Sequence, residues 1–169
     1  MKALTITSPN NSIVEDVAEP IAGDNQVVVD VTRAGICGTD QEFFTGEMVY
    51  LHSNQAKYPV RIGHEWCGVV SAVGKGADQS WIGQRVTGDT MLGCGTCYRC
   101  TSGRQHVCDD RYEIGVRNGW PGACAEKLLV PVRALHKLPD SIDDAINQLL
   151  VLWLATSRIK IYHKNTINA

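Results

Sequence analysis

The sequence lacks any long hydrophobic run and any excess of one charge sign. Its longest strongly apolar stretch, residues 149–155, is far shorter than the roughly 20 residues of a membrane-spanning helix. Sixteen Lys and Arg residues against eighteen Asp and Glu leave a net charge of −2, too little basic charge for a nucleic-acid-binding protein. The first residues contain no apolar core of a secretory signal, so we expect a reducing, cytoplasmic location with neither membrane nor nucleic acid as partner.

Short runs of β-forming residues recur along most of the chain. The chain has 169 residues, of which 44% are hydrophobic and 20% charged, as in a single folded domain. Val27, Val29 and Val31 alternate on one face, which is typical of a half-buried strand. The runs are separated by Gly, Pro, Asn and Asp and cover residues 3–6, 12–14, 27–32, 67–73, 85–87, 125–130 and 134–138. This pattern predicts a mainly β fold, either an antiparallel barrel or a sandwich.

A helical pattern stands out only near the C-terminus. Ser141 and Asp144 resemble a capping box. The apolar residues that follow have i, i+3, i+4, i+7 spacing: Ile146, Leu149, Leu150, Trp153 and Leu154. We expect a C-terminal helix here, followed by a polar tail. Because its apolar stripe has no obvious partner, we also expect a homo-oligomer that buries two such stripes against each other.

Four of the seven cysteines follow the spacing C-x2-C-x2-C-x7-C, at Cys94, Cys97, Cys100 and Cys108. A tetrahedral zinc requires tight turns that bring each sulfur within about 2.3 Å of the metal, and Gly93, Gly95 and Gly103 allow such turns. Free thiols or an iron–sulfur cluster are the alternatives. The closed tetrathiolate pattern favours a structural zinc in a lobe spanning residues 93–109. His106 lies in this lobe and is interpreted as a surface residue, because four cysteines already complete the metal shell.

A second group of metal-binding residue types lies earlier in the chain. Cys37 in GICGTD and His64 in GHEWCG are ligand types of an open catalytic zinc. Asp40 or Glu65 could orient the imidazole by accepting its second N–H. Thr39 offers a hydroxyl that could receive a proton from a metal-bound alcohol. Taken singly, a lone Cys is more often a small buried residue and a lone His a surface one.

With both groups in view, the chain resembles the zinc-containing, medium-chain alcohol and polyol dehydrogenases over residues 1–145. The matching segments are MKAL, GICGTD, GHEWCG, AVGKGAD, GQRV, the four-cysteine lobe, GACAEKLLVP and HKLPDSIDDA. The resemblance implies a GroES-like β domain facing a separate nicotinamide-binding Rossmann domain. It also implies that Cys37 and His64 ligate a catalytic zinc, that Thr39 relays the alcohol proton, and that Glu65 lies beside the metal. The four lobe cysteines would hold a structural zinc.

Two departures from that family concern the C-terminal end. Many polyol and threonine dehydrogenases carry Glu-Pro as the exit helix begins, with the Glu as third protein ligand, whereas this chain reads VLWLAT. Neither Leu152 nor Trp153 can bind zinc. The sequence also contains no G-x-G-x-x-G at a strand-to-helix junction, the motif of a dinucleotide site. Residues 146–169 are therefore interpreted as an atypical helix and tail without a Rossmann domain.

The sequence is thus interpreted as the zinc-binding catalytic domain of an NAD(P)-dependent alcohol, polyol or sugar dehydrogenase. We expect the chain to be inactive by itself, with NAD(P) bound only in a full-length form. The alternative is a non-catalytic, zinc-stabilised β module that binds a partner protein. A zinc-ribbon nucleic-acid binder is disfavoured, because only Arg99 and Arg104 are basic in the lobe. Four residues could line a substrate pocket but are more typical of a core: Tyr50, His52, Trp66 and Trp120.

Overall fold

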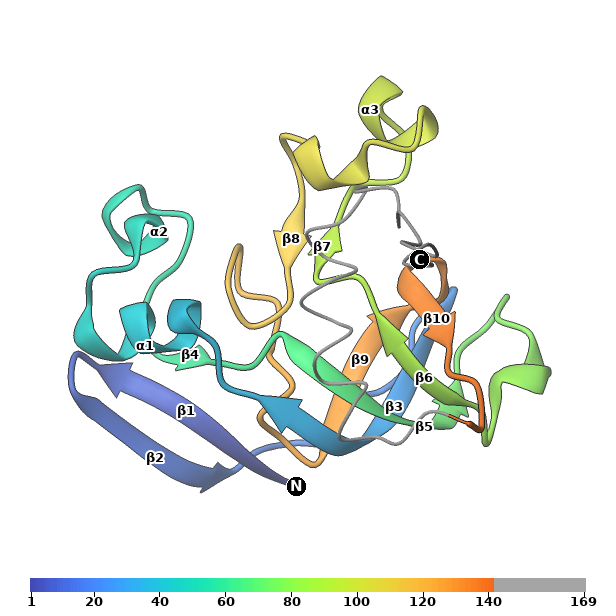
Figure 1. The fold of residues 1–169 in the computed structure, drawn as a ribbon, viewed down its shortest axis with the longest axis horizontal. Helices are drawn as coiled ribbons and strands as arrows, with labels where there is room; N and C mark the ends of the chain where they lie inside the picture. Colours follow the sequence, from blue (N-terminus) through green and yellow to red (C-terminus); the bar gives the residue numbers. More distant parts are fainter. Residues whose placement is uncertain (142–169) are drawn as a thin grey trace, which may run out of the picture.

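The computed structural model describes residues 1–141 as three antiparallel sheets (Figure 1). The five-stranded sheet has the order β10-β6-β5-β3-β9, with bounds Leu135–Lys137, Arg85–Gly88, Glu65–Val73, Gln26–Gly35 and Lys127–Pro131. The three-stranded sheet has the order β2-β1-β4, with bounds Asn11–Asp16, Lys2–Ser8 and Val60–Arg61. β7 (Met91–Leu92) pairs with β8 (Tyr112–Glu113). The prediction of a mainly β, antiparallel fold is confirmed.

β3 lies inside the five-stranded sheet, between β5 and β9. Three consecutive valines, Val27, Val28 and Val29, are all buried, so both faces of this part of the strand are covered. Gly68 of β5 permits the close approach of the two strands, because a Cβ atom there would lie 2.2 Å from the backbone oxygen of Asp30. β3 and β5 stay paired as far as their ends at Gly35 and Glu65, and this pairing positions the candidate site.

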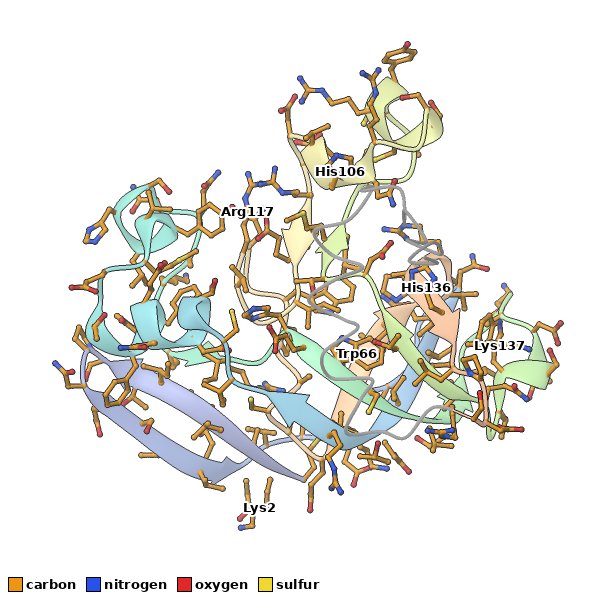
Figure 2. The ribbon with its side chains drawn as sticks, in the orientation of Figure 1. Lys2, Trp66, His106, Arg117, His136 and Lys137 are labelled. Atoms are coloured by element: carbon orange, nitrogen blue, oxygen red, sulfur yellow. The ribbon has the colours of Figure 1, made fainter. Side chains whose placement is uncertain are left out.

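Two hydrophobic cores support the sheets. The larger surrounds Trp66, which is fully buried, as expected of a core residue (Figure 2). Trp120 packs partly buried against this core. The smaller core contains Phe43 and Met48 together with Ile6, Val60, Ile62 and Val116. Because Phe43 lies on α1 (Gly38–Thr45) and Ile6 and Val60 lie on β1 and β4, this core attaches that helix to the three-stranded sheet.

The expectation that helical structure occurs only near the C-terminus is wrong. Among residues 1–141 there are three short α-helices: α1 (Gly38–Thr45), α2 (Val49–His52) and α3 (Tyr98–Thr101). The same residues contain three short 3₁₀ helices: η1 (Gln79–Trp81), η2 (Gln105–Val107) and η3 (Val132–Ala134). α1 buries only Asp40 and Phe43, and no residue of α2 or α3 is buried. Helices this short bury too few residues to display an apolar period in the sequence.

The C-terminal helix predicted from Ile146 onward lies outside the described residues, as do the boundary at residue 145 and the tail. They stay predictions, together with the homo-oligomer that rests on them. Within residues 1–141, no helix has both the length and the apolar character needed to cross a bilayer.

Candidate metal centres

The four lobe cysteines converge on one point. Their sulfur atoms all lie within 4.8 Å of one another, with 3.8 Å between the Sγ atoms of Cys94 and Cys100 and 3.8 Å between those of Cys97 and Cys108. In a regular tetrahedron with zinc–sulfur bonds of about 2.3 Å, the sulfurs lie about 3.8 Å apart. The donor set therefore fits a tetrahedral metal ion. Figure 1 shows that this lobe, with α3 at its tip, projects away from the sheets.

The local backbone explains why the sulfurs converge. A Cβ atom at Gly93 would lie 2.6 Å from the Sγ atom of Cys100, so only glycine fits there. Gly95 and Gly103 adopt φ values of 83° and 73°, which residues other than glycine rarely adopt. Backbone N–H groups also point at sulfur: the N–H of Cys97 donates to the Sγ atom of Cys94 over 3.4 Å. Such bonds stabilise thiolates, the form that binds metal.

Two thiols of the lobe, those of Cys94 and Cys100, have pKa values shifted in opposite directions in the metal-free chain. The hydroxyl and backbone N–H of Thr96 lower the pKa of Cys94 to about 6. The pKa of Cys100 is raised to about 12, because burial and the three neighbouring sulfurs outweigh the backbone N–H of Gly95, which lowers it. Several adjacent negative charges are unfavourable without a cation. A bound metal removes this repulsion, so the lobe has the electrostatics of a metal site. His106 is exposed on the lobe, as expected (Figure 2).

The second group brings together Cys37, Asp40 and His64, whose ligand atoms all lie within 4.8 Å of one another. The Nε2 atom of His64 lies 3.1 Å from the Sγ atom of Cys37. Zinc bonds of about 2.0 Å to nitrogen and 2.3 Å to sulfur place the two atoms about 3.5 Å apart at a tetrahedral angle. A shift of a few tenths of an ångström would therefore admit the ion, and the two residues fit a metal centre.

The pairing of β3 with β5 creates this arrangement. Gly35 at the end of β3 pairs with Glu65 at the start of β5, so Cys37 and His64 lie just beyond the same end of the ladder. Cys37 is also the N-cap of α1: its Sγ atom accepts the backbone N–H of Thr39 over 3.4 Å. The helix begins at this point because Asp40, its third residue, completes a capping box.

Asp40 contacts the segments that carry both Cys37 and His64. Its carboxylate, only 2% exposed as a residue, accepts the backbone N–H of Cys37 over 2.9 Å and that of Gly63 over 3.2 Å. Its Oδ1 atom lies 3.5 Å from the Nδ1 atom of His64, an electrostatic contact slightly too long for a hydrogen bond. Burial lowers the pKa of His64, but Asp40 and Cys37 outweigh it and raise this pKa to about 9. These contacts orient the imidazole so that Nε2 faces Cys37.

Comparison with known proteins shows the family of this chain. The family described as "Alcohol dehydrogenase GroES-like domain" matches residues 23–140. The chain belongs to this family. Starvation-sensing protein RspB of Escherichia coli K12 is 36% identical over 85% of this chain and 40% of its own length. L-threonine 3-dehydrogenase of Idiomarina loihiensis is 36% identical over 85% of this chain and 41% of its own length.

Solved structures show the same likeness to this GroES-like domain. A crystal structure described as a short chain alcohol dehydrogenase from E. coli CFT073 in complex with cofactor NADH has a TM-score of 0.79 and 33% identity, covering 89% of this chain and 42% of that one. Galactitol-1-phosphate dehydrogenase from Escherichia coli has a TM-score of 0.76 and 28% identity, covering 89% of this chain and 41% of that one. The matched part of this chain thus spans about two fifths of the length of these relatives.

Glu65 and Thr39 occupy different positions in this GroES-like domain. The carboxylate of Glu65 is not among the converging ligand atoms of the described residues. The residue is 9% exposed, and its Oε1 atom is buried without a hydrogen-bond partner among residues 1–141. Thr39 lies in the first turn of α1, two residues after Cys37. Of the residues singled out in the sequence, the structure therefore groups Cys37, His64 and Asp40, with Glu65 adjacent in the chain.

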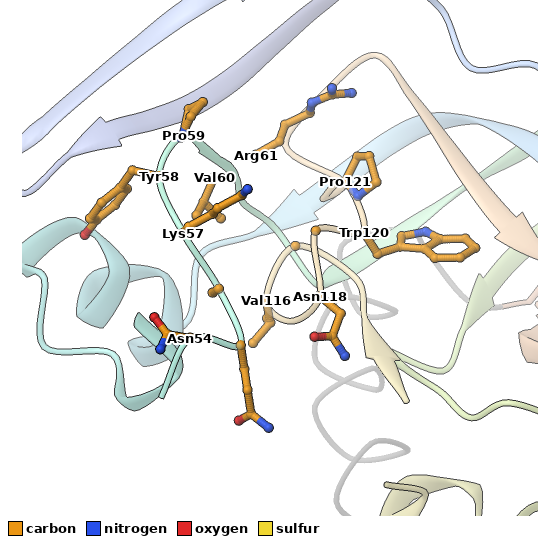
Figure 3. A pocket seen from close by; sticks show the side chains of 14 residues that line it. Asn54, Lys57, Tyr58, Pro59, Val60, Arg61, Val116, Asn118, Trp120 and Pro121 are labelled. Carbon is orange, nitrogen blue, oxygen red and sulfur yellow. The ribbon is translucent and has the colours of Figure 1, made fainter. Parts of the chain in front are cut away.

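Sequence reasoning missed a pocket beside the second metal centre. It has a volume of about 400 Å³ and lies between residues 54–61 and residues 115–121 of the GroES-like domain (Figure 3). Of the aromatic candidates, Trp120 lines this pocket, whereas Tyr50 packs against the smaller core and His52 is exposed. The sequence did contain a hint: the segment KYPVR places two cations around a proline, one residue before the GHE motif.

Proposed function

We propose that this GroES-like domain is the zinc-binding catalytic half of an NAD(P)-dependent dehydrogenase that oxidises an alcohol, polyol or sugar. The observation that carries the proposal is the 3.1 Å approach of Cys37 and His64, held by the buried carboxylate of Asp40. These two residues would hold the catalytic zinc, which supplies Lewis acidity to the substrate oxygen when bound. Relatives named for L-threonine and for galactitol 1-phosphate support a small, hydroxyl-bearing substrate.

Each residue of the centre has its own task. Cys37 and His64 bind through Sγ and Nε2, and Asp40 fixes both by accepting the N–H of Cys37 and facing Nδ1 of His64. The hydroxyl of Thr39, in the adjoining helical turn, relays the proton that leaves the substrate hydroxyl: its Oγ1 atom accepts that proton while its own proton passes to water. Glu65 supplies the third protein ligand when its buried carboxylate, whose Oε1 lacks a partner among residues 1–141, turns toward the centre.

The lobe has a structural task. Four protein sulfurs complete a tetrahedral shell, so no position remains for a substrate. The lobe joins the larger sheet through Arg133, whose Nη2 atom donates to the backbone oxygen of Gly93 over 2.6 Å. Zinc bound by Cys94, Cys97, Cys100 and Cys108 would stabilise the lobe without entering the reaction.

The nicotinamide belongs to a longer form of the protein. The sequence has no G-x-G-x-x-G motif, and the matched relatives extend well beyond the region shared with this chain. Hydride transfer from the substrate carbon needs a cofactor positioned against this domain. The 169-residue chain by itself would therefore bind metal but not turn over substrate.

Cobalt titration of the chain tests the proposal, because sulfur-rich and mixed sulfur–nitrogen sites give different visible spectra. We expect two metals per chain, of which the Cys37–His64 centre, with two firm protein ligands, is lost first on mild chelation. Cys100→Ser should remove the lobe metal, and His64→Ala should remove the second one. A chain that binds one metal and is unaffected by His64→Ala would contradict the catalytic proposal and favour a zinc-stabilised binding module.

A further inference from the structure

The pocket beside the second metal centre carries an unbalanced positive charge. Lys57 and Arg61 line it, whereas none of the residues around it is acidic. Neither side chain forms an ion pair with any other residue in the described part of the chain. Figure 3 shows Lys57 extending from residues 54–61 toward the opposite loop, and Arg61 at the same end as Pro121. A concave site with two uncompensated cations favours an anionic ligand.

The rest of the lining suits an organic molecule rather than a bare inorganic ion. Val60, Val116 and two prolines provide apolar surface, and Trp120 also lines the pocket. The ring of Trp120 extends toward the larger core (Figure 3), and its indole N–H donates to the backbone oxygen of Leu129 over 3.0 Å. The amide of Asn54 and the amide oxygen of Asn118, whose Nδ2 atom donates to the backbone oxygen of Arg111 over 2.9 Å, add hydrogen-bonding groups that suit hydroxyls. A volume of about 400 Å³ is in the range of small-molecule sites.

Both walls of the pocket are connected to the chain segment that carries His64. Arg61 precedes His64 by three residues, a span of at most about 10 Å in extended chain. The opposite loop is joined to the same segment, because the N–H of Gly122 donates to the oxygen of Arg61 over 2.9 Å and that of Ala123 to the oxygen of Gly63 over 2.8 Å. The pocket wall at Arg61 and the candidate ligand His64 are therefore close neighbours in the fold.

We propose that this pocket binds the anionic end of a polyol, either a carboxylate or a phosphate monoester, through Lys57 and Arg61. The reacting hydroxyl then lies at the Cys37–His64 centre, and this second half of the inference rests on the proposed function. The guanidinium of Arg61 offers paired donors to two oxygens of the anion, and Lys57 adds a point charge. Substrate choice thus depends on charge at the pocket, and the chemistry depends on the metal centre.

Titrations followed by ¹⁵N NMR on the zinc-loaded 169-residue chain test the proposal at constant ionic strength. The probes are D-gluconate and D-glucose 6-phosphate as anions, with D-sorbitol as the neutral control. We expect the anions to shift the side-chain amides of Asn54 and Asn118 and the indole of Trp120. The double variant Lys57→Gln/Arg61→Gln should raise the anion Kd roughly tenfold, the combined effect of two partly exposed charge contacts.

The control variant is Lys75→Gln, which removes an exposed cation outside the pocket and should leave the anion Kd unchanged. Preference for gluconate or for glucose 6-phosphate identifies the anionic group, and either preference supports the proposal. Equal binding of sorbitol, unchanged affinity in the double variant, or shifts confined to other regions would overturn it. If the double variant does not fold, the single variant Lys57→Gln, which alters only an exposed side chain, is measured instead and should still raise the anion Kd.

The same titration in Cys37→Ser separates this proposal from the proposed function. Anion binding at the pocket should persist without the second metal, because the cations and the centre are different groups. Anion binding without dehydrogenase activity in a form that contains a nicotinamide site would refute the proposed function and leave the pocket assignment standing. A form that has dehydrogenase activity but does not bind anions at the pocket would refute the pocket assignment and leave the proposed function standing.

Discussion

The Sγ atom of Cys37 is at once the helix cap of α1 and the neighbour of the His64 imidazole, 3.1 Å from its Nε2 atom. These two residues are 27 positions apart in the sequence, and the β3–β5 ladder brings them together. One side chain therefore both caps a helix and belongs to the candidate metal centre. Asp40 shares both tasks, because it closes the capping box and faces the imidazole.

Substitutions of Cys37 should separate capping from metal binding. In Cys37→Ser the hydroxyl can still accept the N–H of Thr39, so the free energy of unfolding of the metal-free chain should change little. In Cys37→Ala the cap is lost, and this free energy should fall by about 1 kcal/mol. Both variants should lose the second metal, which cobalt spectra and urea denaturation would show. Equal stability of the two metal-free variants would contradict the capping role.

Gly93→Ala should disrupt the lobe metal. The added Cβ atom would lie 2.6 Å from the Sγ atom of Cys100 and 2.9 Å from the Cβ atom of Gln105, so the sulfur must move. We expect at least a tenfold loss in affinity for the lobe metal, measured by competition with a chelator. Gly38→Ala is the matched control, because no atom lies within 4 Å of its added Cβ. Retention of full affinity in Gly93→Ala would show that the lobe can rearrange.

Two adjacent phenylalanines offer a matched test of the smaller core. Phe43 is fully buried, whereas Phe44 is 37% exposed. Phe43→Ala should lower the free energy of unfolding by about 3–5 kcal/mol because it leaves a cavity under α1. Phe44→Ala should lower it by less than about 1.5 kcal/mol. Because Cys37 is the N-cap of α1, we also expect weaker binding of the second metal in Phe43→Ala only. Similar losses in both variants would mean that α1 does not depend on this core.

The pair of His136 and Asp89 should make stability depend on pH in the neutral to alkaline range. The Nε2 atom of His136 lies 3.0 Å from the Oδ1 atom of Asp89, and this carboxylate raises the pKa of His136 against the smaller effect of burial. Because the folded-state pKa is above the unfolded one, the stabilisation is full below about pH 6.5 and is lost as the pH rises through the folded value.

Urea denaturation of the wild type and of His136→Gln at pH 6 and pH 8.5 measures this contribution. The difference in unfolding free energy between the two proteins should be larger at pH 6. His136 is partly exposed (Figure 2), so salt should reduce the effect. A difference that is independent of pH would contradict the assignment.

The sequence alone determined the cluster of four lobe cysteines and the fold class. The lobe cysteines lie within fifteen residues, so short-range spacing was enough to predict that their sulfurs meet. The alternating valines of β3 likewise predicted a strand, because a period of two depends only on neighbouring residues. The motifs GICGTD and GHEWCG singled out Cys37 and His64, but their separation of 27 residues gave no reason from spacing alone for the two side chains to meet.

Only the tertiary structure decided the long-range relationships. The pairing of Gly35 with Glu65 places both ligands at one end of a ladder, and a register is set by packing over the whole sheet. Three short helices escaped prediction because burial of Phe43 and capping by Cys37, rather than an apolar period, stabilise α1. The pocket around Lys57 and Arg61 arises from two segments about sixty residues apart, and charge in a concave site appears only when distant chain segments fold together.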